Sequence, residues 1–165
     1  MHHIETKIEE FELKYNYDAS YLKDLLQTSP NGFQKLQDAL PLTFHRQRLD
    51  LESFWVTKIV SVQSIDCGSC LNLNISKALE EGVPQCLINA ILFDETKLCE
   101  AHQALRTYVN SIINNKVDDF AAKFIKRRYS RAQLLELGIC IATAQIFPLI
   151  KKVAGYNNSC SLITI

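Results

Sequence analysis

The sequence predicts an all-α protein, folded as a single-domain helical bundle. Apolar residues recur at i, i+3 and i+4 spacing along most of the chain, which is typical of amphipathic helices. Only 5 Gly and 4 Pro occur in 165 residues, fewer than a β-rich protein with many turns requires. The length suits one domain with one sizeable core.

The first third of the chain indicates three helical segments. Phe11–Leu26 mixes apolar and charged residues at helical spacing, and Thr28–Gly32 predicts a break. Phe33–Leu40 predicts a short amphipathic helix that Pro41 stops. Leu49–Ile65 is rich in β-branched residues, but it is too long and alternates too poorly for a strand, so we expect a helix.

The rest of the chain continues the helical pattern. Gly82 predicts one helix end, Ser130 an N-cap, and Pro148 a kink or bend in the last helix, which ends at Gly155. The expected helices are Leu71–Glu81, Pro84–Ile91, Leu98–Ile113, Phe120–Arg128 and Arg131–Ala154.

Charge and hydropathy argue against two classes of partner. Eighteen Lys plus Arg balance 18 Asp plus Glu, so we expect neither nucleic acid nor an anionic membrane as a partner. No window has about 18 unbroken apolar residues and the first residues resemble no signal peptide, so a cytoplasmic location is expected. Lys126–Arg128 with Arg131 is read as a solvated helix end, with an anion contact as the alternative.

Six cysteines are unusual in a chain of this composition. Cys86, Cys99 and Cys140 lie on predicted apolar helix faces, where we expect core thiols, and Cys160 lies in the polar tail. Zinc normally needs two further Cys or His ligands at recognisable spacing, and His102 is a solitary candidate. We therefore expect no metal and no cofactor.

The segment Cys67-Gly68-Ser69-Cys70 is the strongest functional signal. If it starts the following helix, the unpaired N–H groups and positive dipole end lower the pKa of Cys67. The three-residue offset places Cys70 on the same face, within reach of a disulfide. The pattern indicates a redox dithiol, with chance spacing in a six-Cys chain as the alternative.

This motif lacks the βαβ context of a thioredoxin. The chain instead resembles the carboxymuconolactone decarboxylase family, in its alkylhydroperoxidase D-like branch. The resemblance runs through Ser64–Cys70, the helix–glycine–helix passage Ser76–Pro84 and the late helix from Leu134. It implies a core over 49–155, preceded by a helical extension at 1–48 and followed by a polar tail at 156–165.

The resemblance implies a helical subunit that assembles into trimers or hexamers. It also implies that Cys67 and Cys70 are catalytic, reduce a peroxide substrate and are re-reduced by an external dithiol. By analogy with the family, Cys70 reacts with the peroxide and Cys67 meets the reductant. The helix-terminal argument alone favours Cys67 as the thiolate.

The family's proton relay does not carry over. Its histidine, four residues after the second Cys, is replaced by Asn74, and its glutamate, twelve before the first, by Trp55. Asp66, a candidate N-cap, and Ser69, histidine in some members, complete the possible supporting residues with Asn74 and Trp55. Three further side chains that could approach the motif are read first as surface or flank residues: Glu52, His45 and His102.

Three functional hypotheses follow. The leading one is a thiol–disulfide oxidoreductase with alkylhydroperoxidase-like antioxidant activity, in which Cys67 and Cys70 cycle between dithiol and disulfide. The second is a family member without the relay, acting as a disulfide exchanger or a non-catalytic oligomeric binding module. The third, a lactone decarboxylase, is disfavoured by the C-x-x-C pattern and the missing acid–base histidine.

Overall fold

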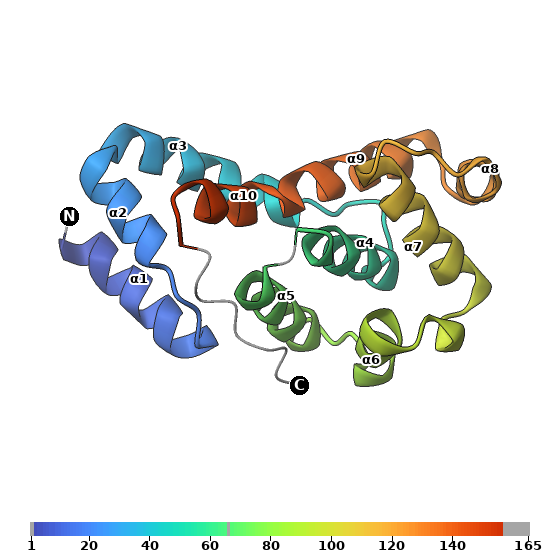
Figure 1. The fold of residues 1–165 in the computed structure, drawn as a ribbon, viewed down its shortest axis with the longest axis horizontal. Coiled ribbons are helices and arrows are strands. Elements are labelled where there is room, and N and C mark those ends of the chain that lie inside the picture. Colours follow the sequence, from blue (N-terminus) through green and yellow to red (C-terminus); the bar gives the residue numbers. More distant parts are fainter. Residues whose placement is uncertain (1, 66, 157–165) are drawn as a thin grey trace.

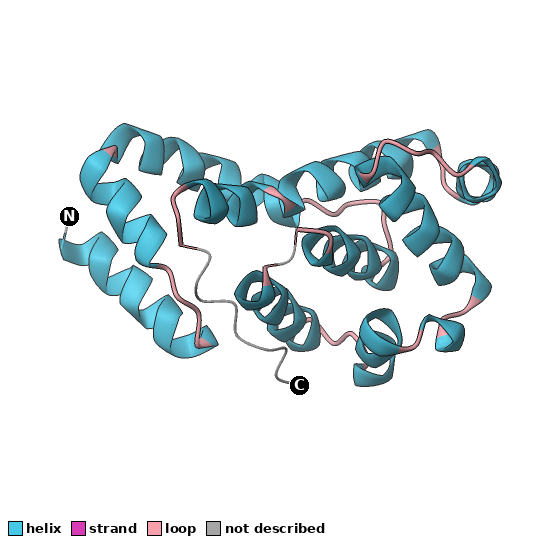
Figure 2. Ribbon diagram, viewed as in Figure 1, coloured by secondary structure: helices cyan, strands magenta, loops and turns pink. Residues whose placement is uncertain are grey.

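The computed structural model describes residues 2–65 and 67–156. These residues form helices joined by short loops, without strands (Figures 1 and 2), which confirms the all-α prediction. In chain order the elements are α1 (His2–Tyr15), α2 (Ser20–Thr28), α3 (Pro30–Ala39), the 3-10 helix η1 (Leu40–Phe44), α4 (Leu51–Gln63), α5 (Gly68–Glu80), α6 (Gln85–Phe93), the 3-10 helix η2 (Glu95–Lys97), α7 (Glu100–Ile113), α8 (Asp119–Arg128), α9 (Arg131–Ala144) and α10 (Ile146–Val153).

Helix α4 forms the centre of the core. Every residue from Ser53 to Val62 is buried, so the helix is covered on all sides, as its apolar, β-branched sequence requires. Asp50 caps its start by accepting a hydrogen bond from the backbone N–H of Ser53 at 2.8 Å. Helices α5, α7 and α9 pack around α4 (Figure 1).

The expectation of one helix over Phe11–Leu26 is wrong. Asn16 adopts a positive φ of 46°, and the chain turns between α1 and α2. Asn tolerates this left-handed conformation better than most residues, and the Tyr17 N–H donates back to the Glu12 carbonyl at 3.1 Å. The turn places Tyr17 and Asp18 within reach of residues from the middle of the sequence.

Two prolines lie in the first turns of helices. The break expected over Thr28–Gly32 is confined to Ser29, because Pro30 occupies the first turn of α3, where its missing N–H costs no hydrogen bond. The α-helix before Pro41 ends at Ala39, as predicted, and Pro41 lies in the first turn of the 3-10 helix η1 that follows.

The last predicted helix divides into α9 and α10 at Gln145. Pro148 is three residues further on, and its ring clashes with the carbonyl of the fourth residue before it, which explains the break upstream of the proline. Residues Arg131–Val153 are long and apolar enough to cross a membrane by length and composition alone. In the fold, Leu137 and Cys140 of this stretch are buried in the protein core.

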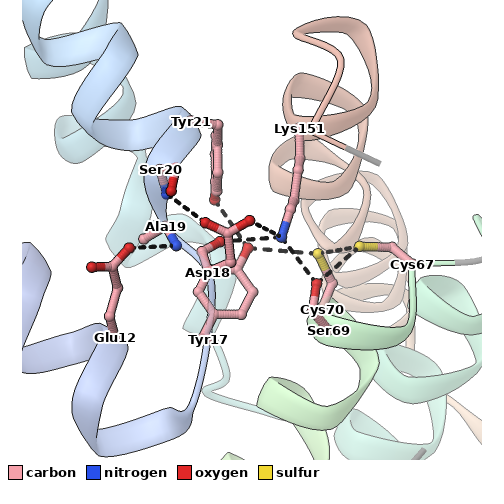
Figure 3. A network of polar contacts seen from close by, with 10 residues as sticks. All are labelled: Glu12, Tyr17, Asp18, Ala19, Ser20, Tyr21, Cys67, Ser69, Cys70 and Lys151. Atoms are coloured by element: carbon pink, nitrogen blue, oxygen red, sulfur yellow. Dashed lines mark hydrogen bonds and ion pairs between the residues drawn. The ribbon is translucent and has the colours of Figure 1, made fainter. Parts of the chain in front are cut away.

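The arrangement of the helices brings three distant parts of the chain together. Helices α1–α3 lie to one side of the core, and α10 lies between them and α5 (Figure 1). The start of α5, the α1–α2 turn and the inward face of α10 thus meet in one region, which contains the C-x-x-C motif (Figure 3).

Candidate redox site

The two cysteines of the motif lie side by side at the start of α5. Cys67 occupies the N-cap position and Gly68 begins the helix, with the Leu71 N–H donating to the Cys67 carbonyl at 2.9 Å. The Cys67 and Cys70 sulfurs are 2.6 Å apart and share a hydrogen bond between free thiols. A small movement of either side chain would bring them to disulfide distance.

The pair divides into an acidic and a weakly acidic thiol. The hydrogen bond from Cys70 lowers the pKa of Cys67 to about 6, against the opposing effect of partial burial, with help from the backbone N–H of Cys70, Ser69 and Lys151. The same hydrogen bond, together with burial, raises the pKa of Cys70. The shared proton therefore resides on Cys70, and half-buried Cys67 is the thiolate near neutral pH.

Lys151 of α10 supplies a buried cation beside the motif. The residue is 1% exposed, and its ammonium donates to the Ser69 hydroxyl at 3.0 Å and to the Asp18 carbonyl at 3.1 Å. The Asp18 carboxylate lies 3.8 Å from the ammonium, and the Tyr17 ring centroid lies 4.8 Å from it. The positive charge favours the thiolate form of both cysteines.

Two buried tyrosines complete the inner side of the site. The Tyr17 hydroxyl is 3.6 Å from the Cys70 sulfur and 3.2 Å from the Tyr21 hydroxyl. Burial, and then the charges around them, raise the pKa of both phenols. Tyr17 therefore remains protonated at any physiological pH and can donate a hydrogen bond to the Cys70 sulfur.

Glu12 holds the turn that presents these residues. Its carboxylate accepts from the Ala19 N–H at 2.9 Å (Figure 3). It also forms an ion pair of 2.6 Å with Lys23. The turn from α1 to α2 is thus fixed at both ends, by Glu12 on one side and Lys151 on the other. The N-terminal helices accordingly contribute directly to the surroundings of the cysteine pair.

A cavity of about 470 Å³ lies between α1–α3 and the helices α4, α5, α9 and α10. Most of its lining is aliphatic or aromatic, and Cys70, Tyr17 and Asn74 form part of its wall. Cys67 is not part of the wall, so the two thiols differ in what can approach them.

The predicted supporting residues are only partly near the sulfurs. Ser69 is close, with its hydroxyl 3.7 Å from the Cys67 sulfur. The Asn74 amide donates to the Cys70 backbone carbonyl at 2.8 Å and, within the described residues, forms no hydrogen bond with a sulfur. Trp55 is fully buried and donates from its indole nitrogen to Glu81 at 3.1 Å. Asp66 lies outside the described residues.

The alternative acids and bases lie elsewhere. Exposed Glu52 and buried His102, expected separately on a surface and a helix flank, form a 3.7 Å contact. Glu52 is in the first turn of α4, whereas the motif follows the other end, about 18 Å along a helix of this length. His45 lies near Glu136, whose carboxylate accepts three backbone N–H groups of residues 47–49.

The isolated cysteines were predicted correctly only in part. Cys140 is buried in the core, and burial raises its pKa to about 12. Cys86 and Cys99 are exposed, which contradicts the expectation of core thiols. Both lie where a helix begins, Cys86 in the first turn of α6 and Cys99 at the N-cap of α7, so the helical periodicity used for the prediction did not apply. Cys160 lies outside the described residues.

Sequence reasoning missed Lys151, Tyr17 and Tyr21. In the sequence Lys151 only interrupts the apolar stretch of the last predicted helix, although a lysine among buried helix residues is uncommon unless it has partners. Nothing in the spacing of Tyr17 and Tyr21 indicated a contact with a motif about fifty residues later.

The arrangement is chemically a dithiol with one activated thiolate, a buried cation and a neutral phenol donor. Within residues 2–65 and 67–156, no group of three or more His, Cys, Asp or Glu side chains could hold a metal ion. Comparison with protein-family models, with curated proteins and with solved structures finds no match.

Proposed function

We propose that the chain is a thiol–disulfide oxidoreductase with alkylhydroperoxidase-like activity. The observation that supports this most is the Cys67–Cys70 pair, with its 2.6 Å contact and its split acidity. Reactive cysteines are found in partly exposed, electropositive surroundings, and Cys67 with Lys151 nearby fits that description. The C-x-x-C within an all-α chain agrees with the proposed membership in the alkylhydroperoxidase D-like branch.

The cycle begins with attack of the Cys67 thiolate on the terminal oxygen of a hydroperoxide, ROOH. The O–O bond breaks, Cys67 becomes a sulfenic acid, and the alkoxide takes a proton from solvent to leave as ROH. The Cys70 sulfur then displaces water from the sulfenic acid, forming the Cys67–Cys70 disulfide. An external dithiol returns two electrons and two protons, and is itself oxidised to a disulfide.

This assignment reverses the order implied by the family, in which the second cysteine meets the peroxide. Two features favour Cys67 as the attacking thiol: its pKa of about 6 and its exposure, against the raised pKa and burial of Cys70. Tyr17 hydrogen bonds to the Cys70 sulfur, where it would stabilise the thiolate that develops when the second step begins.

A disulfide exchanger without peroxidase activity is the second candidate. It is favoured by the contacts of the described part of the chain, where the side-chain hydrogen bonds of the two sulfurs are those with Ser69, with Tyr17 and with each other. General acid–base assistance contributes about 10²–10⁴-fold to many reactions. Within residues 2–65 and 67–156, neither sulfur forms a hydrogen bond with a His or Glu side chain, the usual donors.

Peroxide consumption coupled to a dithiol reductant tests the proposal. Wild type should consume an alkyl hydroperoxide, Cys67→Ser should abolish it, and Cys70→Ser should arrest the cycle at a sulfenic acid on Cys67. If the Cys67–Cys70 pair cycles between dithiol and disulfide but wild type consumes no more peroxide than Cys67→Ser does, the chain is a disulfide exchanger. If Cys67→Ser keeps both peroxide consumption and disulfide exchange, both proposed functions are refuted.

We also infer a cytoplasmic homo-oligomer, a trimer or hexamer, from the family resemblance. Exposed Phe93 and Phe120, at 64% and 79% exposure, are apolar side chains that an interface would cover. Light scattering at micromolar concentration tests this inference, because a monomeric mass would refute it.

A further inference from the structure

We propose that the cavity between the N-terminal helices and the core binds an aliphatic monocarboxylate, with its carboxylate among Lys58, Lys77 and Phe44 and its chain along the apolar wall. This site does not depend on the redox chemistry proposed above. The inference is carried by the size of the cavity, its apolar wall and the unusual placement of its charges.

The size and lining fit one small amphiphile. At about 470 Å³ the cavity falls within the range of roughly 300–1,000 Å³ that is typical of small-molecule sites. At about 30 Å³ per methylene-sized group, it takes roughly fifteen non-hydrogen atoms. The apolar wall includes Ile8, Phe11, Phe33, Leu73 and Phe147, which come from α1, α3, α5 and α10.

The charged residues of the wall are all cations. Lys7, Lys58 and Lys77 line the cavity, and no Asp or Glu is among the described residues that do so. None of the three lysines forms an ion pair with a carboxylate within the described residues. Glu80 lies on the same helix as Lys77, but its carboxylate is engaged by Lys14 at 3.1 Å and by the Tyr15 hydroxyl at 2.9 Å.

Lys58 is the more unusual of the two inner lysines. It is 3% exposed, and its ammonium donates to the Thr43 carbonyl and lies 5.2 Å from the Phe44 ring centroid. Burial lowers its pKa because the charge loses its hydration, and the opposing effect of Cys140 is smaller. A buried ammonium has three donors, so this contact leaves hydrogen-bonding capacity for an entering carboxylate.

Lys77 lies at the same end of the cavity. Its ammonium is 5.3 Å from the Phe44 ring centroid and 4.6 Å from that of Tyr15. Both inner lysines thus surround Phe44, a residue that remains 38% exposed, and define a cationic end to an apolar space. An anionic head with an apolar tail matches this distribution, whereas a neutral lipid leaves the cations unpaired and a cationic amphiphile is repelled.

Calorimetric titration with three ligands of equal chain length tests the proposal. Dodecanoate should bind at one site per chain, at least about tenfold more tightly than 1-dodecanol, and dodecyltrimethylammonium should bind more weakly still. A hydrogen bond to a charged group is worth about 1.5–3 kcal/mol, so Lys58→Met should weaken dodecanoate binding about tenfold or more. Lys77→Met should weaken it about threefold, and both should leave 1-dodecanol nearly unchanged.

Lys123→Met is the matched control, because Lys123 is exposed on α8 and does not line the cavity. It should bind all three ligands as wild type does. If Lys58→Met does not fold by circular dichroism, half-buried Lys77 carries the test. Equal affinity for dodecanoate and 1-dodecanol, unchanged selectivity in the Lys77 variant, or no binding of dodecanoate would each overturn the proposal.

Discussion

The acidity of Cys67 depends above all on the thiol of Cys70. The hydrogen bond between the sulfurs is the largest of the effects that lower its pKa, while Ser69 and Lys151 contribute less. Cys70→Ala removes that bond and leaves the partial burial of Cys67, which opposes ionisation. The pKa of Cys67 should therefore rise from about 6 to within about one unit of the ordinary thiol value near 8.5.

The change in thiolate fraction follows from these values. At pH 7 a thiol with a pKa of about 6 is about 90% ionised, and one with a pKa of about 8.5 is about 3% ionised. The rate at pH 7 should fall less than the ionised fraction, because a less acidic thiolate is a better nucleophile, with a Brønsted coefficient of about 0.4–0.5. The midpoint of the pH–rate profile is thus the better measure.

The assay is alkylation of Cys67 by iodoacetamide between pH 4 and about 10, followed by mass mapping of its peptide. Cys86→Ala is the matched control, because Cys86 is an exposed thiol on another helix. In this variant the alkylation midpoint of Cys67 should equal that of wild type. A midpoint that stays within about half a unit of the wild-type value in Cys70→Ala would refute the shared-proton account.

Further predictions concern the surroundings of the pair. Lys151→Met should raise the pKa of Cys67 by less than about one unit. It should also lower the free energy of unfolding by about 1–3 kcal/mol in urea, because the buried Ser69 hydroxyl and the part-buried Asp18 carbonyl lose their donor; unchanged stability would contradict this. Trp55→Phe should lower the free energy of unfolding by about 1 kcal/mol, because the hydrogen bond to Glu81 is lost, and should leave the alkylation midpoint of Cys67 unchanged. A shifted midpoint would indicate that Trp55 takes part in proton transfer to the pair. Because the pKa of Cys67 is lower in the folded chain, the contribution of its thiolate to stability should be present above about pH 8.5 and should be lost as pH falls through about 6. Plots of the urea midpoint against pH should therefore differ in slope between wild type and Cys67→Ser across that window. Parallel plots would refute this prediction.

Local sequence signals predicted the helical core but not the approach of the N-terminal helices. Periodicity located α4 and α8, and Ser130, expected as an N-cap, begins α9 and accepts a hydrogen bond from the Gln133 backbone N–H. The turn at Asn16 escaped prediction because a single residue of positive φ leaves no break in the apolar pattern. Its position decides which side chains reach the motif.

The residues of the candidate site also divide into those that local sequence signals predict and those that they do not. Cys67 and Cys70 could be placed from the sequence because three residues separate them on one helix start. Lys151 and Tyr17 could not, because they are 81 and 53 positions from the cysteines nearest to them in space. Contacts at such separations arise from packing of whole helices, which local propensity does not encode.

The central claim is that Cys67 and Cys70 form a reversible disulfide. Equilibration of the folded chain in thiol–disulfide buffers of graded potential, with acid trapping and mass mapping, measures this most directly. The account predicts a two-electron transition confined to a Cys67–Cys70 bond, while buried Cys140 stays reduced. Oxidation of the exposed cysteines while Cys67 and Cys70 both remain free thiols at every potential would contradict it.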